Sequence, residues 1–318
     1  MKHTLSILMI ILFANFPNAQ QPNYESLWEK VNQFQTKGLP KSALDVVEGI
    51  EKKAAKDKNH PQLIKTMLFK SKYALILEED AQLNIINDFK KQIALSEFPA
   101  KNVFESILAN LYWQYFNQNR WQFYNRTKTS EKVDSEDFRT WDLQTLFNEI
   151  HLHYQKSLKN GLMLQQERLE NYGPLLTEHK GSKIYRPTLF EFLSHTALSF
   201  YKTNETHITK PAYKFEIDNS KFSSDAETFS TLKIESKDST SLQLNALNIY
   251  KDLIRFHLKD KSPFALANVN IERLKFVNQH ATFSNKQTIL LDAFKTASTR
   301  LKAHEVSGLY DFEMASIH

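Results

Sequence analysis

The sequence predicts an all-α protein, with helical hairpins arranged as a tetratricopeptide-like solenoid or array. Apolar residues recur every three or four positions through most of the chain, which is the spacing of one face of a helix. Only 6 of the 318 residues are glycine and 9 are proline, so the chain lacks the dense turns of an all-β fold. The apolar segments span roughly 12 to 18 residues and are joined by short connections, as in antiparallel helix pairs.

The first five helices are predicted from residue 24 onward. Residues 24–35 form the first segment, and the later ones open at Pro40, near Pro61, near Asp80 and at Ala100. Alternate helices therefore begin at intervals of about forty residues, which is typical of helical-hairpin repeats. The tetratricopeptide consensus residues are not present in order, so the repeat family stays open.

The fifth helix leads into an aromatic stretch, Leu111 to Thr127, with seven aromatic side chains in seventeen residues. This helix is apolar on two sides, which predicts an inner helix covered by neighbours on both. The amides of residues 117–119 then interrupt the pattern. We consider five residues here as a possible contact for a protein partner: Trp113, Arg120, Trp121, Tyr124 and Arg126. The alternative, which is the commoner arrangement, is a core corner where arginine stems pack on aromatic rings.

Helical periodicity continues after a polar stretch at 128–140. Further helices are predicted at residues 142–157, 189–201, 242–258, 268–280 and 286–302. Between them, residues 204–240 lose this periodicity, and two short segments alternate like strands. We expect a small irregular or β-hairpin insertion near 205–240, which divides the helical region into 20–203 and 241–318.

The last residues begin another amphipathic turn with Leu309, Phe312, Met314 and Ile317. A terminal repeat normally presents a polar capping face, and none is visible in this segment. We therefore expect the region 241–318 to be truncated at its C-terminus, as the first piece of a longer protein. The other possibility is that the last apolar face packs elsewhere.

The first 19 residues have the order of a secretory signal. Lys2 and His3 precede an apolar run, Leu5 to Phe13, and Ala19 is a suitable last residue before cleavage. This run is too short to span a bilayer, and no later run approaches the roughly 20 apolar residues that a spanning helix needs. We expect an exported protein without a transmembrane segment in its mature chain, in the periplasm or cell envelope or secreted.

The composition excludes several classes of site. The chain has no cysteine, which rules out disulfides, thiolate metal sites and cysteine nucleophiles. Its formal charge of +5 comes from 41 basic and 36 acidic residues in mixed-sign faces, which does not indicate a nucleic-acid partner.

No group of residues predicts a reaction. His151 and His153 are two apart, so they do not share a helical face as a metal pair would. The acidic run Glu78 to Asp80 stands where a helix begins and where the helix dipole favours acids. Nucleophile and phosphate-binding motifs are missing. We therefore predict no catalytic, cofactor or metal site, and a protein that is not an enzyme.

Several segments carry a family resemblance, among them GLPKSALDVV, YWQYFNQNRWQFYNRT, RPTLFEFLSHTALSFY and ALNIYKDLIRFHL. Together they resemble the N-terminal helical region of large bacterial alpha-macroglobulin-like envelope proteins. This resemblance implies a signal peptide and a helical region, followed by β-sandwich domains that often carry a protease-trapping thioester. A chain without cysteine has no thioester. The resemblance therefore implies a scaffold or docking module that contacts a protein partner or downstream domains of the same chain.

Two other functions stay open. A secreted hydrolase is suggested by the export signal and the acidic run at Glu78. A glycan-binding uptake component is suggested by the aromatic residues near Trp121.

Overall fold

The computed structural model describes residues 23–126, 134–203, 205 and 213–317. Most of these residues are helical, and none of them belongs to a strand. The prediction of an all-α helical array is confirmed. The predicted signal segment, residues 1–19, lies outside the described residues. No described helix has both the length and the apolar character needed to cross a bilayer.

The first five helices begin within one residue of their predicted starts. They are α1 (Tyr24–Thr36), α2 (Pro40–Lys56), α3 (His60–Leu77), α4 (Ala81–Leu95) and α5 (Ala100–Gln118). Local capping explains part of this agreement, since the side chains of Asn23 and Asn59 accept hydrogen bonds from backbone N–H groups of the first turns of α1 and α3. Each of these helices packs against the next one.

The middle of the chain alternates helices with short turns. The symbol η marks a short 3-10 helix. In chain order the elements are α6 (Arg120–Tyr124), η1 (Phe138–Thr140), α7 (Leu143–Ser157), α8 (Gly161–Leu164), η2 (Leu169–Leu175), η3 (Ser182–Ile184) and α9 (Leu189–Tyr201). The break between α5 and α6 falls in the predicted amide run. Thr188 and Glu191 form a capping box that fixes the start of α9.

The last part begins with two short helical segments. They are η4 (Ser220–Ser223) and α10 (Ala226–Thr231), followed by α11 (Leu242–His257), α12 (Phe264–His280), α13 (Lys286–Arg300) and α14 (Ser307–Ala315). From α11 to α14, each helix again packs on its predecessor. At the C-terminal turn, Leu309, Met314 and Ile317 pack against the cluster formed with α12 and α13, whereas Phe312 is 70% exposed.

An irregular or β-hairpin insertion was expected near residues 205–240, and the described residues of this segment are irregular. The backbone pairing in this segment is a single bridge between Ile217 and Ala281, and no hairpin forms in its described part. Phe215, Ile217 and Phe229 are buried in the main hydrophobic cluster. The alternating pattern around Phe215 and Ile217 therefore reflects side chains that enter the core from an extended loop, whereas Phe229 enters it from α10.

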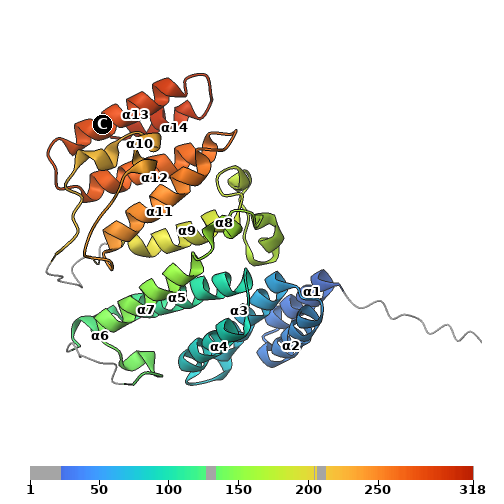
Figure 1. The fold of residues 1–318 in the computed structure, drawn as a ribbon. Coiled ribbons are helices and arrows are strands. Elements are labelled where there is room, and N and C mark those ends of the chain that lie inside the picture. The colour runs from blue at the N-terminus through green and yellow to red at the C-terminus, as the bar shows by residue number, and fades with distance from the viewer. Residues whose placement is uncertain (1–22, 127–133, 204, 206–212, 318) are drawn as a thin grey trace, which may run out of the picture.

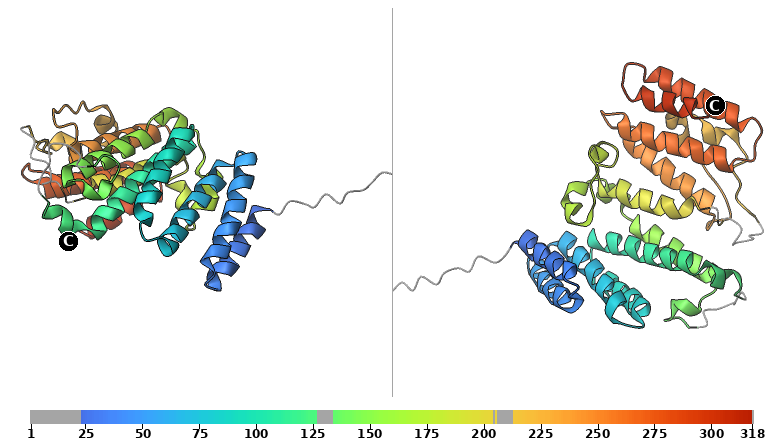
Figure 2. Two further views of the ribbon diagram at one scale, coloured as in Figure 1. Left: turned by 90° about the horizontal axis from the view of Figure 1, so that it is seen from below. Right: turned by 180° about the vertical axis from the view of Figure 1, so that it is seen from behind.

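The helices form two tiers that meet along α5, α7 and α9 (Figures 1 and 2). The chain runs through the lower tier of Figure 1 from α1 to α7 and then through the upper tier from α9 to α14. One large hydrophobic cluster joins α3 to α12 across both tiers, and a smaller cluster lies at each end of the array. α5 is the inner helix that its two apolar sides predict, because α4, α7 and α9 all contact it.

Candidate functional site

Trp113, the first of the five candidate contact residues, lies in the aromatic core. Its ring centroid is 5.3 Å from that of Phe116, 5.9 Å from that of Phe147 and 5.3 Å from that of Phe200. These rings come from α5, α7 and α9, so Trp113 joins three helices. The ring is partly buried and packs against the main hydrophobic cluster, so its main role is to hold these helices together.

The two arginines pack on aromatic rings. The guanidinium of Arg126 lies 4.6 Å from the ring centroid of Phe123, and its Nη1 donates to the carbonyl oxygen of Trp141 over 2.7 Å. The guanidinium of Arg120 lies 5.5 Å from the ring centroid of Phe116. Both arginines therefore stabilise the end of the aromatic core, as the alternative interpretation of this stretch expects.

The other two candidates lie on the surface. Both belong to the short helix α6, where Trp121 is 83% exposed and Tyr124 is 52% exposed. The Tyr124 hydroxyl donates a hydrogen bond to Glu205, and Glu205 also forms an ion pair with Arg120, with 2.9 Å between Nη2 and Oε1. We refer to Arg120, Trp121, Tyr124 and Glu205 as the α6 corner. Glu205 is distant in sequence, and no local pattern marks it as a member.

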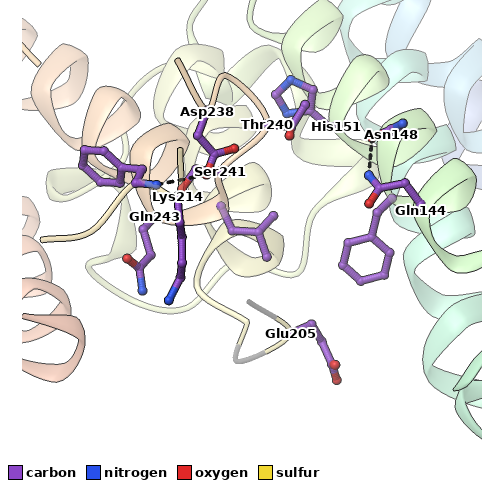
Figure 3. A pocket seen from close by; sticks show the side chains of 12 residues that line it. Gln144, Asn148, His151, Glu205, Lys214, Asp238, Thr240, Ser241 and Gln243 are labelled. Carbon is purple, nitrogen blue, oxygen red and sulfur yellow. Dashed lines mark hydrogen bonds between the residues drawn. The ribbon is translucent and has the colours of Figure 1, made fainter. Parts of the chain in front are cut away.

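A small cavity of about 40 Å³ adjoins the α6 corner through Glu205 (Figure 3). Gln144 and Asn148 of α7 form one side of it and are joined by a 2.8 Å hydrogen bond. Asp238 lies on the other side and accepts a hydrogen bond from the backbone N–H of Phe215 over 3.1 Å. A volume of this size holds one or a few waters, so the cavity is too small for a substrate.

His151 also lines this cavity and forms a hydrogen bond with Tyr201 of α9. Its Nδ1 lies 2.9 Å from the hydroxyl of Tyr201, and burial lowers the pKa of His151 below its ordinary value. The imidazole is therefore neutral at pH 7, and its Nδ1 accepts a hydrogen bond from the Tyr201 hydroxyl. His153, two residues later, faces Glu105 of α5 instead. The two histidines thus point to different neighbours, in agreement with their sequence spacing.

Comparisons of the chain with known protein families, curated proteins and solved structures find no match.

The acidic run at residues 78–80 forms surface contacts. Glu78 accepts a hydrogen bond from the side chain of Asn84 over 3.1 Å, and Asp80 forms an ion pair with Arg139 over 2.8 Å. These carboxylates are exposed and have separate partners. They do not face each other as an acid and base pair across a substrate would. Among the described residues, no group of three or more histidine or acidic side chains is arranged to hold a metal ion.

Two buried carboxylate and histidine contacts were missed by the sequence interpretation. Glu105 Oε2 lies 2.5 Å from His153 Nδ1, between α5 and α7. Glu191 Oε1 lies 3.6 Å from His257 Nε2, between α9 and α11. Burial raises the pKa of Glu191. All four side chains are enclosed by packed helices, so they are placed to join helices rather than to meet a substrate.

Proposed function

We propose that the chain is a non-enzymatic, exported scaffold that binds another protein through the α6 corner. The observation that carries this proposal is the exposure of Trp121 beside a buried aromatic core. Tryptophan, tyrosine and arginine are the residues most enriched among energetic hot spots of protein interfaces. All three occur in the α6 corner, and the contacts of Arg120 and Tyr124 with Glu205 hold it in place before binding.

Rigidity favours binding at this corner. A partner that covers Trp121 would not have to order α6, because Phe123 of the same helix is fully enclosed by the core. Pre-ordered contact residues lower the entropic cost of association. The α6 corner is therefore better suited to recognition than Leu95 or Phe312, because no second large hydrophobic side chain of α4 or α14 is exposed beside them.

We further propose that this scaffold is the N-terminal part of an alpha-macroglobulin-like protease-inhibitor chain in the periplasm or cell envelope, without a thioester. The resemblance in sequence and the helical array support this assignment. In that setting the partner of the α6 corner would be a downstream domain or another envelope protein. Reading the gene past the codon of His318 tests it, since an open frame encoding β-sandwich domains is expected. A stop codon there would contradict it.

Photocrosslinking tests the binding site. With benzoylphenylalanine at position 121, we expect one discrete adduct in the cell envelope of the native host, identified by mass spectrometry. The matched control carries the same group at position 312, where the native phenylalanine is also largely exposed. Equal adducts from both positions, or none from position 121, would remove the basis for an interface at the α6 corner.

Replacement of Trp121 by alanine is expected to weaken binding of the captured partner by at least about 30-fold, the effect of a strong hot spot. The free energy of unfolding should change by less than about 0.5 kcal/mol, because the side chain is exposed. Titration calorimetry and urea denaturation measure the two quantities. An unchanged affinity would contradict the proposal, and Phe312→Ala is the matched control.

A second candidate function is glycan binding, which the exposed Trp121 ring also favours because aromatic faces stack on sugar rings. Tryptophan fluorescence measured across a glycan panel separates the two functions. A shift that disappears in Trp121→Ala would support glycan binding. An unchanged spectrum in every glycan would leave the protein partner as the proposed ligand.

A further inference from the structure

A cavity of about 350 Å³ lies at the C-terminal end of the array, between α10, α12, α13 and α14. Its volume falls in the range of small-molecule sites, about 300 to 1,000 Å³. Side chains such as Leu266, Leu274 and Ala293 give it apolar walls. Polar groups from Ser224, Asn270 and Tyr310 also line it. Apolar walls with a few polar groups are typical of a ligand site.

The fully buried Arg273 side chain is hydrogen-bonded to two of the residues that line the cavity, Ser224 and Asn270. Arg273 has no exposed surface, and its guanidinium donates to the carbonyl oxygens of Phe222 over 2.9 Å and Ser224 over 2.7 Å. Within the described part of the chain, no carboxylate lies within ion-pair distance of it. Burial lowers the pKa of Arg273 to about 9, so the side chain is still mostly protonated at pH 7. Buried charges in proteins are usually paired, whereas the hydrogen-bond acceptors of Arg273 are neutral, and the Asp225 carboxylate acts on it from beyond ion-pair distance.

Hydrogen bonds connect Arg273 to the cavity wall. Its Nη2 donates to Asn270 Oδ1 over 2.6 Å, and Asn270 Nδ2 donates to the Tyr310 hydroxyl oxygen over 3.2 Å. The tyrosine oxygen is thus an acceptor in this chain of bonds, and its own proton remains available to donate. The Oγ of Ser224 is buried and has no hydrogen-bond partner among the described residues. Ser224 and Tyr310, whose hydroxyl protons are both free to donate, therefore line the same cavity, and Tyr310 is linked to Arg273 through Asn270.

We propose that this cavity binds a small apolar monocarboxylate. Its carboxylate accepts hydrogen bonds from the hydroxyls of Ser224 and Tyr310 and places a negative charge near Arg273, which forms no ion pair among the described residues. Its apolar body lies along the helix faces that carry Leu274 and Ala297.

The carboxylates that also line the cavity favour this orientation. Asp225 caps α10 and accepts from the backbone N–H of Thr228 over 3.0 Å, and Glu227 forms an ion pair with Arg300 over 2.6 Å. Asp292 has no such partner among the described residues and repels a second negative charge. A ligand anion is therefore expected beside Arg273 rather than beside Asp292. A cationic ligand would instead prefer Asp292, so a comparison of anionic and cationic ligands tests the proposal.

Calorimetric titration of the full mature chain with decanoate, decan-1-ol and decylammonium tests the proposal. We expect decanoate to bind at least about tenfold more tightly than the alcohol, because a charge-assisted hydrogen bond is stronger than a neutral one. Ser224→Ala and Tyr310→Phe should each weaken decanoate binding by about 3- to 10-fold, the effect of one lost hydrogen bond. Equal binding of the alcohol, tighter binding of the amine, or no binding of decanoate would overturn the proposal.

A filled cavity provides the control for location. Ala297→Trp places a large side chain in the cavity and should abolish decanoate binding, whereas Ala303→Trp adds the same ring at an exposed position outside it. Decanoate binding that survives Ala297→Trp would place the ligand elsewhere and overturn the assignment. If Ala297→Trp fails to fold, the effects of Ser224→Ala and Tyr310→Phe still decide whether decanoate binds in this cavity. Trp121→Ala should leave decanoate binding unchanged, which separates this site from the α6 corner.

Discussion

Replacement of Phe200 by alanine is expected to lower the free energy of unfolding by about 3 to 5 kcal/mol, the range for a large buried aromatic side chain. Phe200 is fully buried on α9. Its ring centroid lies 5.3 Å from Trp113, 5.4 Å from Phe147 and 5.6 Å from Tyr154. These rings belong to α5 and α7, so the substitution opens a void where the two tiers of helices meet. The surrounding rings are fixed by several neighbours and can close that void only in part.

Urea denaturation followed by far-ultraviolet circular dichroism measures this effect. Phe312→Ala is the matched control, because it removes the same side chain from a largely exposed position and should cost less than about 0.5 kcal/mol. We also expect Phe200→Ala to broaden the transition, since the weakened contact is the one between the tiers. If both variants unfolded at the same urea concentration, the two tiers would not depend on this ring for their packing.

The positions of most helices could be predicted because the signals that set them are local. Pro40 begins α2, and the apolar spacing that follows it matches the buried residues Ala43, Val47 and Ile50. The amides at residues 117–119 mark the break between α5 and α6. In each case the sequence pattern and the physical cause lie within a few residues of each other.

Residues that enter the core from loops could not be predicted in the same way. Phe138 lies in a stretch interpreted as polar loop, and it is buried against Tyr112 and Tyr115 of α5. Phe215 and Ile217 suggested a possible hairpin, whereas they fill the core from an irregular segment. A short alternating pattern predicts which side chains are buried, but it does not predict which helices cover them. Contacts between distant parts of the chain decide that.

The candidate sites show the same limit. The density of aromatic and arginine residues marked the α6 corner but could not separate Trp113, which is partly buried against the core, from Trp121, which is exposed. Glu205 completes the corner from a distant loop. Arg273 had no visible role in the sequence, because its neutral acceptors are backbone carbonyls that only the fold brings to it.

The second large effect is expected at Glu105, where replacement by alanine should lower the free energy of unfolding by about 3 to 5 kcal/mol below pH 6. Glu105 and His153 are buried, and 2.5 Å separates the carboxylate oxygen from Nδ1. Burial alone lowers the pKa of His153, but the hydrogen bonds to Glu105 and Glu149 outweigh it, so the pKa is raised. Loss of Glu105 leaves the imidazole enclosed without its nearest counter-charge.

The direction of the raised pKa fixes the pH dependence of this effect. A histidine whose pKa is higher in the folded state stabilises the fold fully below its unfolded value of about 6.5. That contribution is lost as the pH rises through the folded pKa. The destabilisation caused by Glu105→Ala should therefore be larger at pH 5.5 than at pH 9, as measured by urea denaturation at both values.

The substitution His153→Gln provides the control for the proton. In a His153→Gln background, Glu105→Ala should cost the same at both pH values, because no titrating partner remains beside the carboxylate. Glu149→Ala should have a smaller effect than Glu105→Ala, since its carboxylate is 3.6 Å from Nε2 and less buried. Should the cost of Glu105→Ala in the wild-type background not vary with pH, the contact would stabilise the fold through packing and a neutral hydrogen bond, and not through a charged pair.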